Sequence, residues 1–219
     1  MNVLILGATG MVGQGVLREC LLDGGVTRVV TLGRAATGQS HPKLEEIVHA
    51  DLFHLSAIED RLRGLDACFY CLGVSAAGMS EAEYSRVNYE MTLAVAEALV
   101  RTSPGLIFVY VSGTGTDSSE RGRVMWARVK GRTENALLRL PFRSAYMLRP
   151  GLIVPMHGVK SKTRLYRAFY TMLGPLLPIL RKRFPRSIIT TEQLGGAMLR
   201  LARSGYPKPV LEAGDLATF

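Results

Sequence analysis

Short apolar runs alternate along this chain with longer segments in which apolar residues recur at helical spacing. After the first run, for example, Val12, Val16 and Cys20 mark one face of a helix. Strands that alternate with helices are typical of a parallel α/β sheet. Strands are predicted at residues 3–6, 29–32, 45–50, 67–71, 106–111, 143–148 and 210–212, and the main helices around 12–21, at 81–101, around 126–130, and at 191–203.

A glycine-rich turn joins the first strand to the first helix. Gly7, Gly10 and Gly13 follow one another at three-residue spacing. Gly7 would make the turn, Gly10 would admit a pyrophosphate against the backbone, and Gly13 would let helix and strand pack closely. The helix N-terminus would present unpaired N–H groups and the positive end of the helix dipole, which predicts an anion site. The spacing differs from G-x-G-x-x-G, so a plain glycine turn is the alternative interpretation.

This stretch resembles the short-chain dehydrogenase/reductase superfamily, on its extended and atypical side. The signature T/A-G-x-x-G-x-x-G matches residues 8–13, in which Thr9, Met11 and Val12 accompany the glycines. The resemblance implies a doubly wound Rossmann fold with strand order 3-2-1-4-5-6-7 and a bound NAD(P). It also suggests a link to the Tat-interacting oxidoreductase-like group and to proteins labelled sugar-nucleotide epimerases.

Length, charge and cysteine content limit the class of protein. A chain of 219 residues is expected to form one domain. Its net charge of +9 comes from scattered basic residues without a nucleic-acid motif, so anionic small ligands are favoured over nucleic acid. Three cysteines do not form a disulfide framework, and no signal-peptide pattern opens the sequence, so a cytoplasmic location is expected.

A membrane span, a metal site and a redox cysteine pair are all disfavoured by the sequence. The apolar-rich segment 165–180 is interrupted by Arg167, Gly174, Pro175 and Pro178, so a stable membrane span is not expected. The four histidines show no metal-ligand spacing, and no metal site is predicted. Cys68 and Cys71 would face opposite sides of the sheet, so we interpret both as core residues rather than as a redox pair.

The cofactor expected at this fold is NADP(H) rather than NAD(H). Arg34 follows the second strand, and no acidic residue lies between Val26 and Leu44 to bind the ribose hydroxyls. A guanidinium there could pair with a 2′-phosphate, although a solvated loop charge is the alternative. Resemblance implies further cofactor contacts from Asp51 and Leu52 after the third strand, and from Leu72 and Gly73 after the fourth.

The candidate chemistry follows the fifth strand. The superfamily uses a Ser after this strand and a Tyr-x-x-x-Lys on the next helix, and Ser112 and Lys130 match that pattern by resemblance. Trp126 stands at the tyrosine position. An indole N–H donates a hydrogen bond but does not titrate, so the proton would come from water, from Ser112, or from another tyrosine such as Tyr84 or Tyr110. Asn88 matches an Asn that orders water beside the Lys, or it is a surface residue.

The sixth strand ends in Arg149-Pro150-Gly151, a run that strongly resembles the nicotinamide border of the extended family. Resemblance extends that border through Leu152 and Ile153. Residues from about 156 to 185 are expected to form a small substrate lobe inside a single domain, 1–219. A lid helix is favoured there, and an apolar substrate channel, a homodimer face or a membrane-touching surface stays open.

Three functions are compatible with this pattern. The first is an NADP(H)-dependent oxidoreductase that transfers hydride to or from a small, rather apolar carbonyl or alcohol. The second is a catalytically silent NADP(H)-binding sensor or regulator. The third, a sugar-nucleotide epimerase or dehydratase, is suggested by family likeness alone.

Overall fold

A parallel sheet of seven strands forms the centre of the computed structural model, which describes residues 1–159, 183 and 186–219. The strand order is β3-β2-β1-β4-β5-β6-β9, and every neighbouring pair is parallel. This order confirms the doubly wound sheet predicted from the sequence. The strands are β1 (Asn2–Leu6), β2 (Arg28–Gly33), β3 (Leu44–Val48), β4 (Ala67–Tyr70), β5 (Ile107–Val111), β6 (Ser144–Arg149) and β9 (Val210–Glu212).

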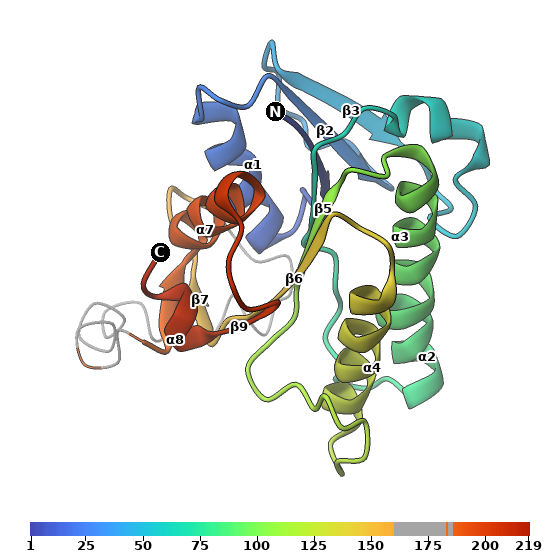
Figure 1. The fold of residues 1–219 in the computed structure, drawn as a ribbon, viewed down its shortest axis with the longest axis vertical. Helices are drawn as coiled ribbons and strands as arrows, with labels where there is room; N and C mark the ends of the chain where they lie inside the picture. Colours follow the sequence, from blue (N-terminus) through green and yellow to red (C-terminus); the bar gives the residue numbers. More distant parts are fainter. Residues whose placement is uncertain (160–182, 184–185) are drawn as a thin grey trace.

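Helices cover both faces of this sheet (Figure 1). One face carries α1 (Met11–Leu22), α7 (Thr191–Ser204) and the short α8 (Ala213–Leu216). The other carries η1 (Ser56–Leu62), α3 (Met91–Thr102) and α4 (Met125–Arg139). The helix that contains α3 starts with α2 (Glu81–Ser85), which a Ser80–Glu83 capping box opens, and continues through the π-helical turn η2 (Arg86–Glu90).

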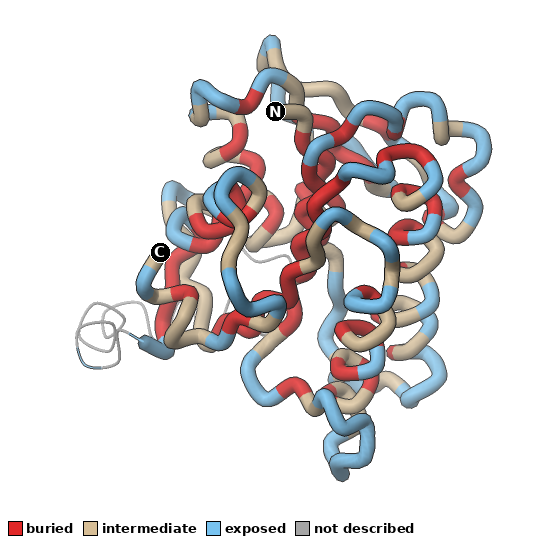
Figure 2. Tube along the Cα trace, viewed as in Figure 1, coloured by how far each residue is buried: buried red, intermediate tan, exposed pale blue. Residues whose placement is uncertain are grey.

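The sheet separates two apolar cores, and the central strands are buried on both faces (Figure 2). Alternate residues of β1 enter different cores: Val3 and Ile5 face α1 and α7, whereas Leu4 and Leu6 face α3 and η1. Cys68 belongs to the second core and Cys71 packs against the first, as the alternation predicts. Burial raises the pKa of both thiols, and of Cys20, which keeps them in the neutral form.

The structure differs from the predicted elements in two places. The third strand ends at Val48, and His49 donates its backbone N–H to the Gly33 carbonyl beyond it. Residues predicted to run along the nicotinamide border form β7 (Leu152–Val154), which pairs with β8 (Ile188–Thr190) in a second, parallel sheet. Gly151 permits this pairing, because a Cβ there would lie 2.3 Å from the Ser187 carbonyl oxygen. Most of the predicted substrate lobe lies outside the described residues.

Helices α1 and α7 touch through a residue without a side chain. A Cβ added to Gly15 of α1 would lie 2.5 Å from the Thr191 Cβ at the start of α7. Thr191 is itself buried, and its hydroxyl accepts a hydrogen bond from the Met156 N–H at 3.1 Å. Gly15 therefore sets the separation between the helix at the glycine turn and the segment that follows β7.

We expect the Gly15→Ala substitution to destabilise the fold by about 1–3 kcal/mol, because the new methyl group overpacks this contact. Gly196→Ala on α7 is the matched control, since nothing lies within 4 Å of its added Cβ. That control should gain about 0.5–1 kcal/mol from helix propensity. Urea unfolding of both variants measures the difference, and equal stability would contradict the packing argument.

Candidate active site

The glycine turn after β1 is shaped by contacts that leave no room for side chains. Gly7 has φ +77°, and a Cβ on it would lie 2.7 Å from the Leu72 nitrogen after β4. A Cβ on Gly13 would lie 2.1 Å from the Gly7 carbonyl oxygen, so α1 packs directly against the turn. Gly7 therefore forms the turn and Gly13 the close helix contact, which are the roles that the sequence predicts for them.

The N-terminus of α1 opens toward the carboxyl edge of the sheet. Gly10 caps this helix without any side-chain hydrogen bond, and the first turn carries no acidic residue. The Gln14 N–H makes the first helical bond to the Gly10 carbonyl at 2.9 Å, so the N–H groups of Met11, Val12 and Gly13 precede the ladder. Because Gly10 has no side chain to cover them, these donors fit a pyrophosphate.

Arg34 lies on the same edge as this cradle. The register pairs Leu6 of β1 with Leu32 of β2, so Gly33 and Arg34 come level with the glycine turn. Arg34 is exposed and makes no hydrogen bond or ion pair with another residue of the described chain. None of the described residues therefore competes with an anion for its guanidinium donors.

Asp51 lies in the loop after β3, next to the buried Leu52. Its carboxylate accepts a hydrogen bond from His54 Nδ1 at 2.7 Å and from the Phe53 N–H at 2.9 Å, while Leu52 is buried. The hydrogen bond from His54 is the main cause of the lowered pKa of Asp51. The carboxylate is thus held by its own loop, as a plain turn would hold it.

Asn88 faces the end of β4 from the π-helical turn. Its side chain is 2% exposed, and its Oδ1 is a buried atom without a hydrogen-bond partner among the described residues. A Cβ on Gly73 would lie 3.6 Å from that oxygen, so the acceptor points at the glycine after β4. A buried acceptor without a donor is costly, and a ligand or water at Gly73 would satisfy it.

Two threonine hydroxyls contact the backbone carbonyl oxygen of Asn88. Thr92 Oγ1 donates to it at 2.9 Å, and Thr133 Oγ1 of α4, which also donates to the Val129 carbonyl at 2.8 Å, lies 3.1 Å from it. Sequence reasoning missed Thr133, whose only signal is its position three residues after Lys130 on the same helix. Asn88 is therefore a buried residue at the interface of two helices, and the surface alternative is wrong.

Lys130 reaches the end of β5, as the predicted helix requires. Its ammonium donates to Tyr110 Oη at 3.2 Å and to the Val111 carbonyl at 3.4 Å. Burial is the main cause of the lowered pKa of Lys130, opposed by the Tyr84 phenol and the Glu134 carboxylate. An ammonium has three donors, and within the part of the chain that the structure describes these two contacts leave one of them for a ligand at the edge of the sheet.

Ser112 follows Val111 on the same edge, with its hydroxyl 3.0 Å from Thr116 Oγ1. Thr116 donates its single proton to the Gly113 carbonyl at 2.8 Å, so Ser112 is the donor of the pair. Trp126 packs against this loop, because a Cβ on Gly115 would lie 3.5 Å from its Cη2. The indole thus covers the loop after β5 instead of placing a phenol there.

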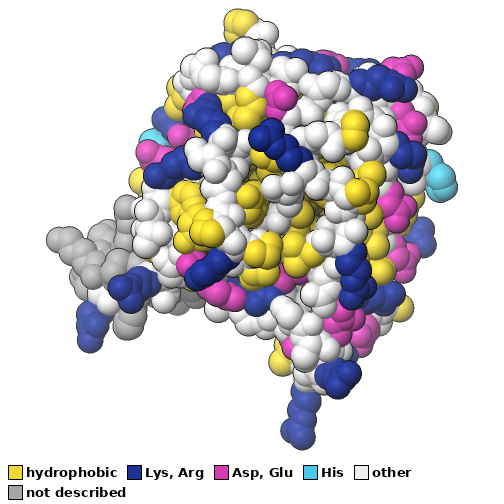
Figure 3. Space-filling view, in the orientation of Figure 1, with side chains coloured by type: hydrophobic (Ala, Val, Ile, Leu, Met, Phe, Trp, Pro, Cys, Tyr) yellow, Lys and Arg dark blue, Asp and Glu magenta, His cyan; other side chains and the backbone are white. Residues whose placement is uncertain are grey.

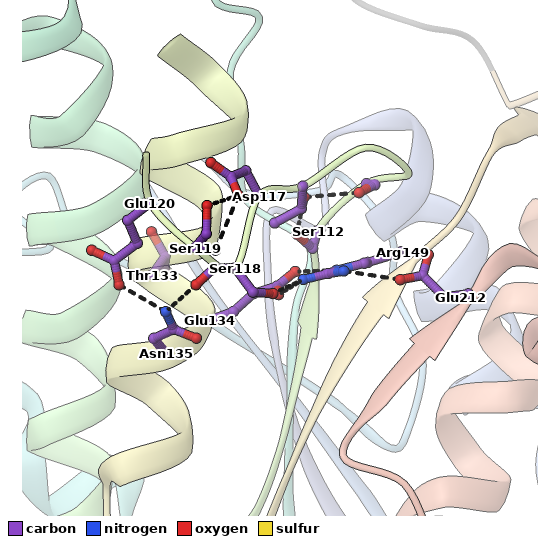
Figure 4. Close-up of polar contacts among 12 residues, drawn as sticks. Ser112, Asp117, Ser118, Ser119, Glu120, Thr133, Glu134, Asn135, Arg149 and Glu212 are labelled. Carbon is purple, nitrogen blue, oxygen red and sulfur yellow. Dashed lines mark hydrogen bonds and ion pairs between the residues drawn. The ribbon is translucent and has the colours of Figure 1, made fainter. Parts of the chain in front are cut away.

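A buried ion-pair network fixes α4 against the sheet (Figure 4). Arg149 at the end of β6 donates to both carboxylate oxygens of Glu134, at 3.1 and 2.5 Å. It also donates to Glu212 of β9 at 2.9 Å and to Ser118 Oγ at 2.5 Å. The Glu134 hydrogen bond is the main cause of the raised pKa of Arg149. Sequence reasoning placed Arg149 before Pro150 but missed its partner, four residues after Lys130.

We expect Glu134→Gln to cost about 3–5 kcal/mol of stability, because it leaves Arg149 buried beside a neutral partner. Glu134 is 1% exposed and Arg149 9% exposed, so little solvent compensates for the lost charge. The Glu212→Gln control removes a partner whose side chain is 53% exposed, and it should cost at most about 1 kcal/mol. Chemical denaturation compares the two, and equal losses would contradict the role of burial.

A hollow lies away from this edge. It is lined by apolar residues at the amino end of β6 and by the segment before β9, including Phe142, Tyr146 and Tyr206. Apolar side chains also gather in the middle of the face shown in Figure 3.

No helix in the described part of the chain is long and apolar enough to cross a membrane. Among the same residues, no group of three acidic, His or Cys side chains could hold a metal.

Comparison with known proteins identifies the family. Residues 3–122, which run from β1 to the loop after β5, match the NAD dependent epimerase/dehydratase family. The chain belongs to this family. A relative named protein fmp52, mitochondrial, from Emericella nidulans is 31% identical over 170 residues, 74% of this chain and 70% of that protein. The family match ends before α4, so it does not include Trp126 or Lys130.

Solved structures agree on the fold. The Bordetella bronchiseptica enzyme WbmF in complex with NAD+ has a TM-score of 0.68 at 17% identity, covering 99% of this chain and 76% of WbmF. A short-chain dehydrogenase/reductase family oxidoreductase from Burkholderia thailandensis has a TM-score of 0.67 at 19% identity and covers 100% and 93%. The chain therefore has the NAD(P)-binding fold that the resemblance implies.

The cytoplasmic location expected from the sequence is wrong. The Emericella nidulans relative and further relatives at 24% to 31% identity are all named as mitochondrial proteins. The physical reason for the error lies in the argument from cysteines. A low cysteine count argues against an oxidising compartment, but it does not distinguish among compartments that keep thiols reduced.

Proposed function

We propose that this protein is an NADP(H)-dependent oxidoreductase that transfers hydride to or from a small, rather apolar carbonyl or alcohol. The observation that carries the proposal is the position of Lys130. Its ammonium lies at the end of β5, where it donates to the carbonyl of Val111, the residue before Ser112, and among the described residues one donor is left for a ligand. The glycine turn and the orphaned Asn88 oxygen lie at the same edge of the sheet.

The residues that would hold the cofactor come from successive strand ends. The glycine turn and the N-terminus of α1 would bind the pyrophosphate, and Arg34 would bind the 2′-phosphate. Leu72 and Gly73 would lie against the dinucleotide through their backbone. The full proposed set is Gly7, Thr9, Gly10, Met11, Val12, Gly13, Arg34, Asp51, Leu52, Leu72, Gly73, Lys130, Pro150, Gly151, Leu152 and Ile153.

When bound, the nicotinamide supplies or accepts the hydride. Lys130 would hold the nicotinamide ribose and provide positive charge at the reacting end of the site. Ser112 would turn its proton from Thr116 toward the substrate oxygen and stabilise the charge that develops there. Trp126 would orient substrate with its indole N–H but would supply no proton.

A silent NADP(H)-binding regulator is the second candidate, and Trp126 is the observation that favours it. The sugar-nucleotide epimerase or dehydratase candidate has only the family name as support. The oxidoreductase and the silent regulator require the same cofactor-binding residues, so cofactor binding does not distinguish them. Catalytic turnover does.

We expect Arg34→Ala to weaken NADPH binding about 10- to 100-fold, the loss that corresponds to a charge-assisted hydrogen bond of about 1.5–3 kcal/mol. NADH, which lacks the 2′-phosphate, should bind the variant as it binds the parent protein. Arg63→Ala is the control, since Arg63 pairs with Asp60 just before β4, at the opposite edge of the sheet. Calorimetric titration measures each affinity, and a parent protein that prefers NADH would overturn the NADP assignment.

We expect the parent protein to oxidise NADPH in the presence of members of a panel of apolar ketones and aldehydes. Lys130→Met should reduce that turnover at least about 100-fold, because both the ribose contact and the positive charge are lost. The Arg132→Met control removes a cation that stacks 4.0 Å from the Tyr89 ring centroid on the outside of α4, and it should retain activity. NADPH binding without turnover in the parent, with turnover gained by Trp126→Tyr, would instead support the silent regulator.

A further inference from the structure

We propose that Tyr84 of α2 is the phenol that works with Lys130 in place of the residue missing at position 126. This inference rests on the proposed oxidoreductase function and names the proton donor of the same site. The sequence left three sources of the proton open: water, Ser112, or another tyrosine such as Tyr84 or Tyr110. Helix packing, side-chain direction and charge favour Tyr84.

Two contacts between the helices fix the level of Tyr84 along α4. Arg128 donates to Glu81 at 2.5 Å, and Thr133 Oγ1 lies 3.1 Å from the Asn88 carbonyl oxygen. The two helices therefore run in the same direction. Tyr84 lies three residues after Glu81 and four before Asn88, and Lys130 lies two residues after Arg128 and three before Thr133. Tyr84 and Lys130 thus come level, between the two contacts.

Helix geometry also sets the direction of the Tyr84 side chain. Residues four apart lie on one helix face, and Asn88 Nδ2 donates to the Tyr84 carbonyl at 3.2 Å. Asn88 points at Gly73 after β4, so the same face of α2 looks toward the cofactor side of the sheet. Tyr84 is one turn closer to the helix N-terminus, and therefore nearer the carboxyl edge where ligands bind.

Charge distinguishes Tyr84 from Tyr110. Tyr84 is 2% exposed, and its phenol raises the pKa of the Lys130 ammonium, so the two groups interact across a water-poor interface. Tyr110 lies deeper, on β5, where its ring is 5.8 Å from the Tyr70 ring and is fully buried. Burial and the Glu134 carboxylate both raise the pKa of Tyr110, which makes it a poor proton source. Tyr110 instead positions Lys130 by accepting its hydrogen bond.

Reduction of the carbonyl requires one hydride, from the cofactor, and one proton, from Tyr84. A bound reduced nicotinamide would supply the hydride for the new C–H bond, and the carbonyl π pair would move to oxygen. Tyr84 gives its proton to that oxygen and forms the O–H bond of the alcohol product. The tyrosinate that remains is stabilised by the Lys130 ammonium until solvent returns a proton. The reverse reaction uses Tyr84 as the base.

The test compares Tyr84→Phe with Tyr89→Phe in the full chain. Phe keeps the ring in place at both positions, and Tyr89 lies on the next turn with its ring against Arg132. Tyr84→Phe should lower kcat for carbonyl reduction about 100-fold while leaving the Kd for NADPH within about twofold. Tyr89→Phe should leave both quantities within about twofold. An unchanged kcat in Tyr84→Phe, or equal losses in the two variants, would overturn the assignment.

A second measurement does not depend on turnover. With NADP+ bound, the absorbance of tyrosinate is followed as the pH is raised, and one early ionisation step should depend on Lys130, whose ammonium stabilises the phenolate that the proposed proton transfer leaves. That step should disappear in Tyr84→Phe, move to higher pH in Lys130→Met, and persist in Tyr89→Phe. If no variant turns over, the oxidoreductase proposal fails together with the donor role. An early step that survives in Tyr84→Phe overturns the Tyr84–Lys130 pair alone.

Discussion

The close approach of α1 to the turn after β1 is the constraint on which the remainder of the structure depends. A helix can pack this tightly against a carbonyl only where its residue lacks a side chain, as at Gly13 beside Gly7. The same approach directs the first N–H groups of α1 toward the carboxyl edge of the sheet. Once β1 and α1 are fixed in this way, the parallel order places the ends of β2, β4, β5 and β6 along the same edge of the sheet.

The other half of the site depends on a different force. Helix α4 is attached to the sheet by the Arg149–Glu134 ion pair and by the contact of Gly131 with the loop after β5. A Cβ on Gly131 would lie 1.8 Å from the Asp117 carbonyl oxygen, so this helix also relies on a missing side chain. Both contacts lie within one turn of Lys130. They hold its ammonium at the strand end, where burial lowers its pKa.

Much of this could be predicted from the sequence, because the strong signals are local. Apolar runs and their spacing predict the strands of the main sheet and their order, and the glycine spacing predicts the turn. The second sheet of β7 and β8 could not be predicted, since its strands have only three residues each and lie far apart in the chain. Nor could the partners of Arg149 or the occupied carbonyl of Asn88, which depend on how helices meet in space. The expectation of a cytoplasmic location failed because a low cysteine count indicates a reducing environment and does not say which compartment provides it.

The π-helical turn at Arg86–Glu90 has a consequence for how this helix can change. Such a turn accommodates one residue more than an α-helix of the same length requires. Because the extra residue is taken up within the turn, deleting one residue there would convert it to an ordinary α-helical turn, with α3 still in its core and Tyr84 still on the side that faces α4. The helix can therefore change its length by one residue at this turn without rotating the site away from α4.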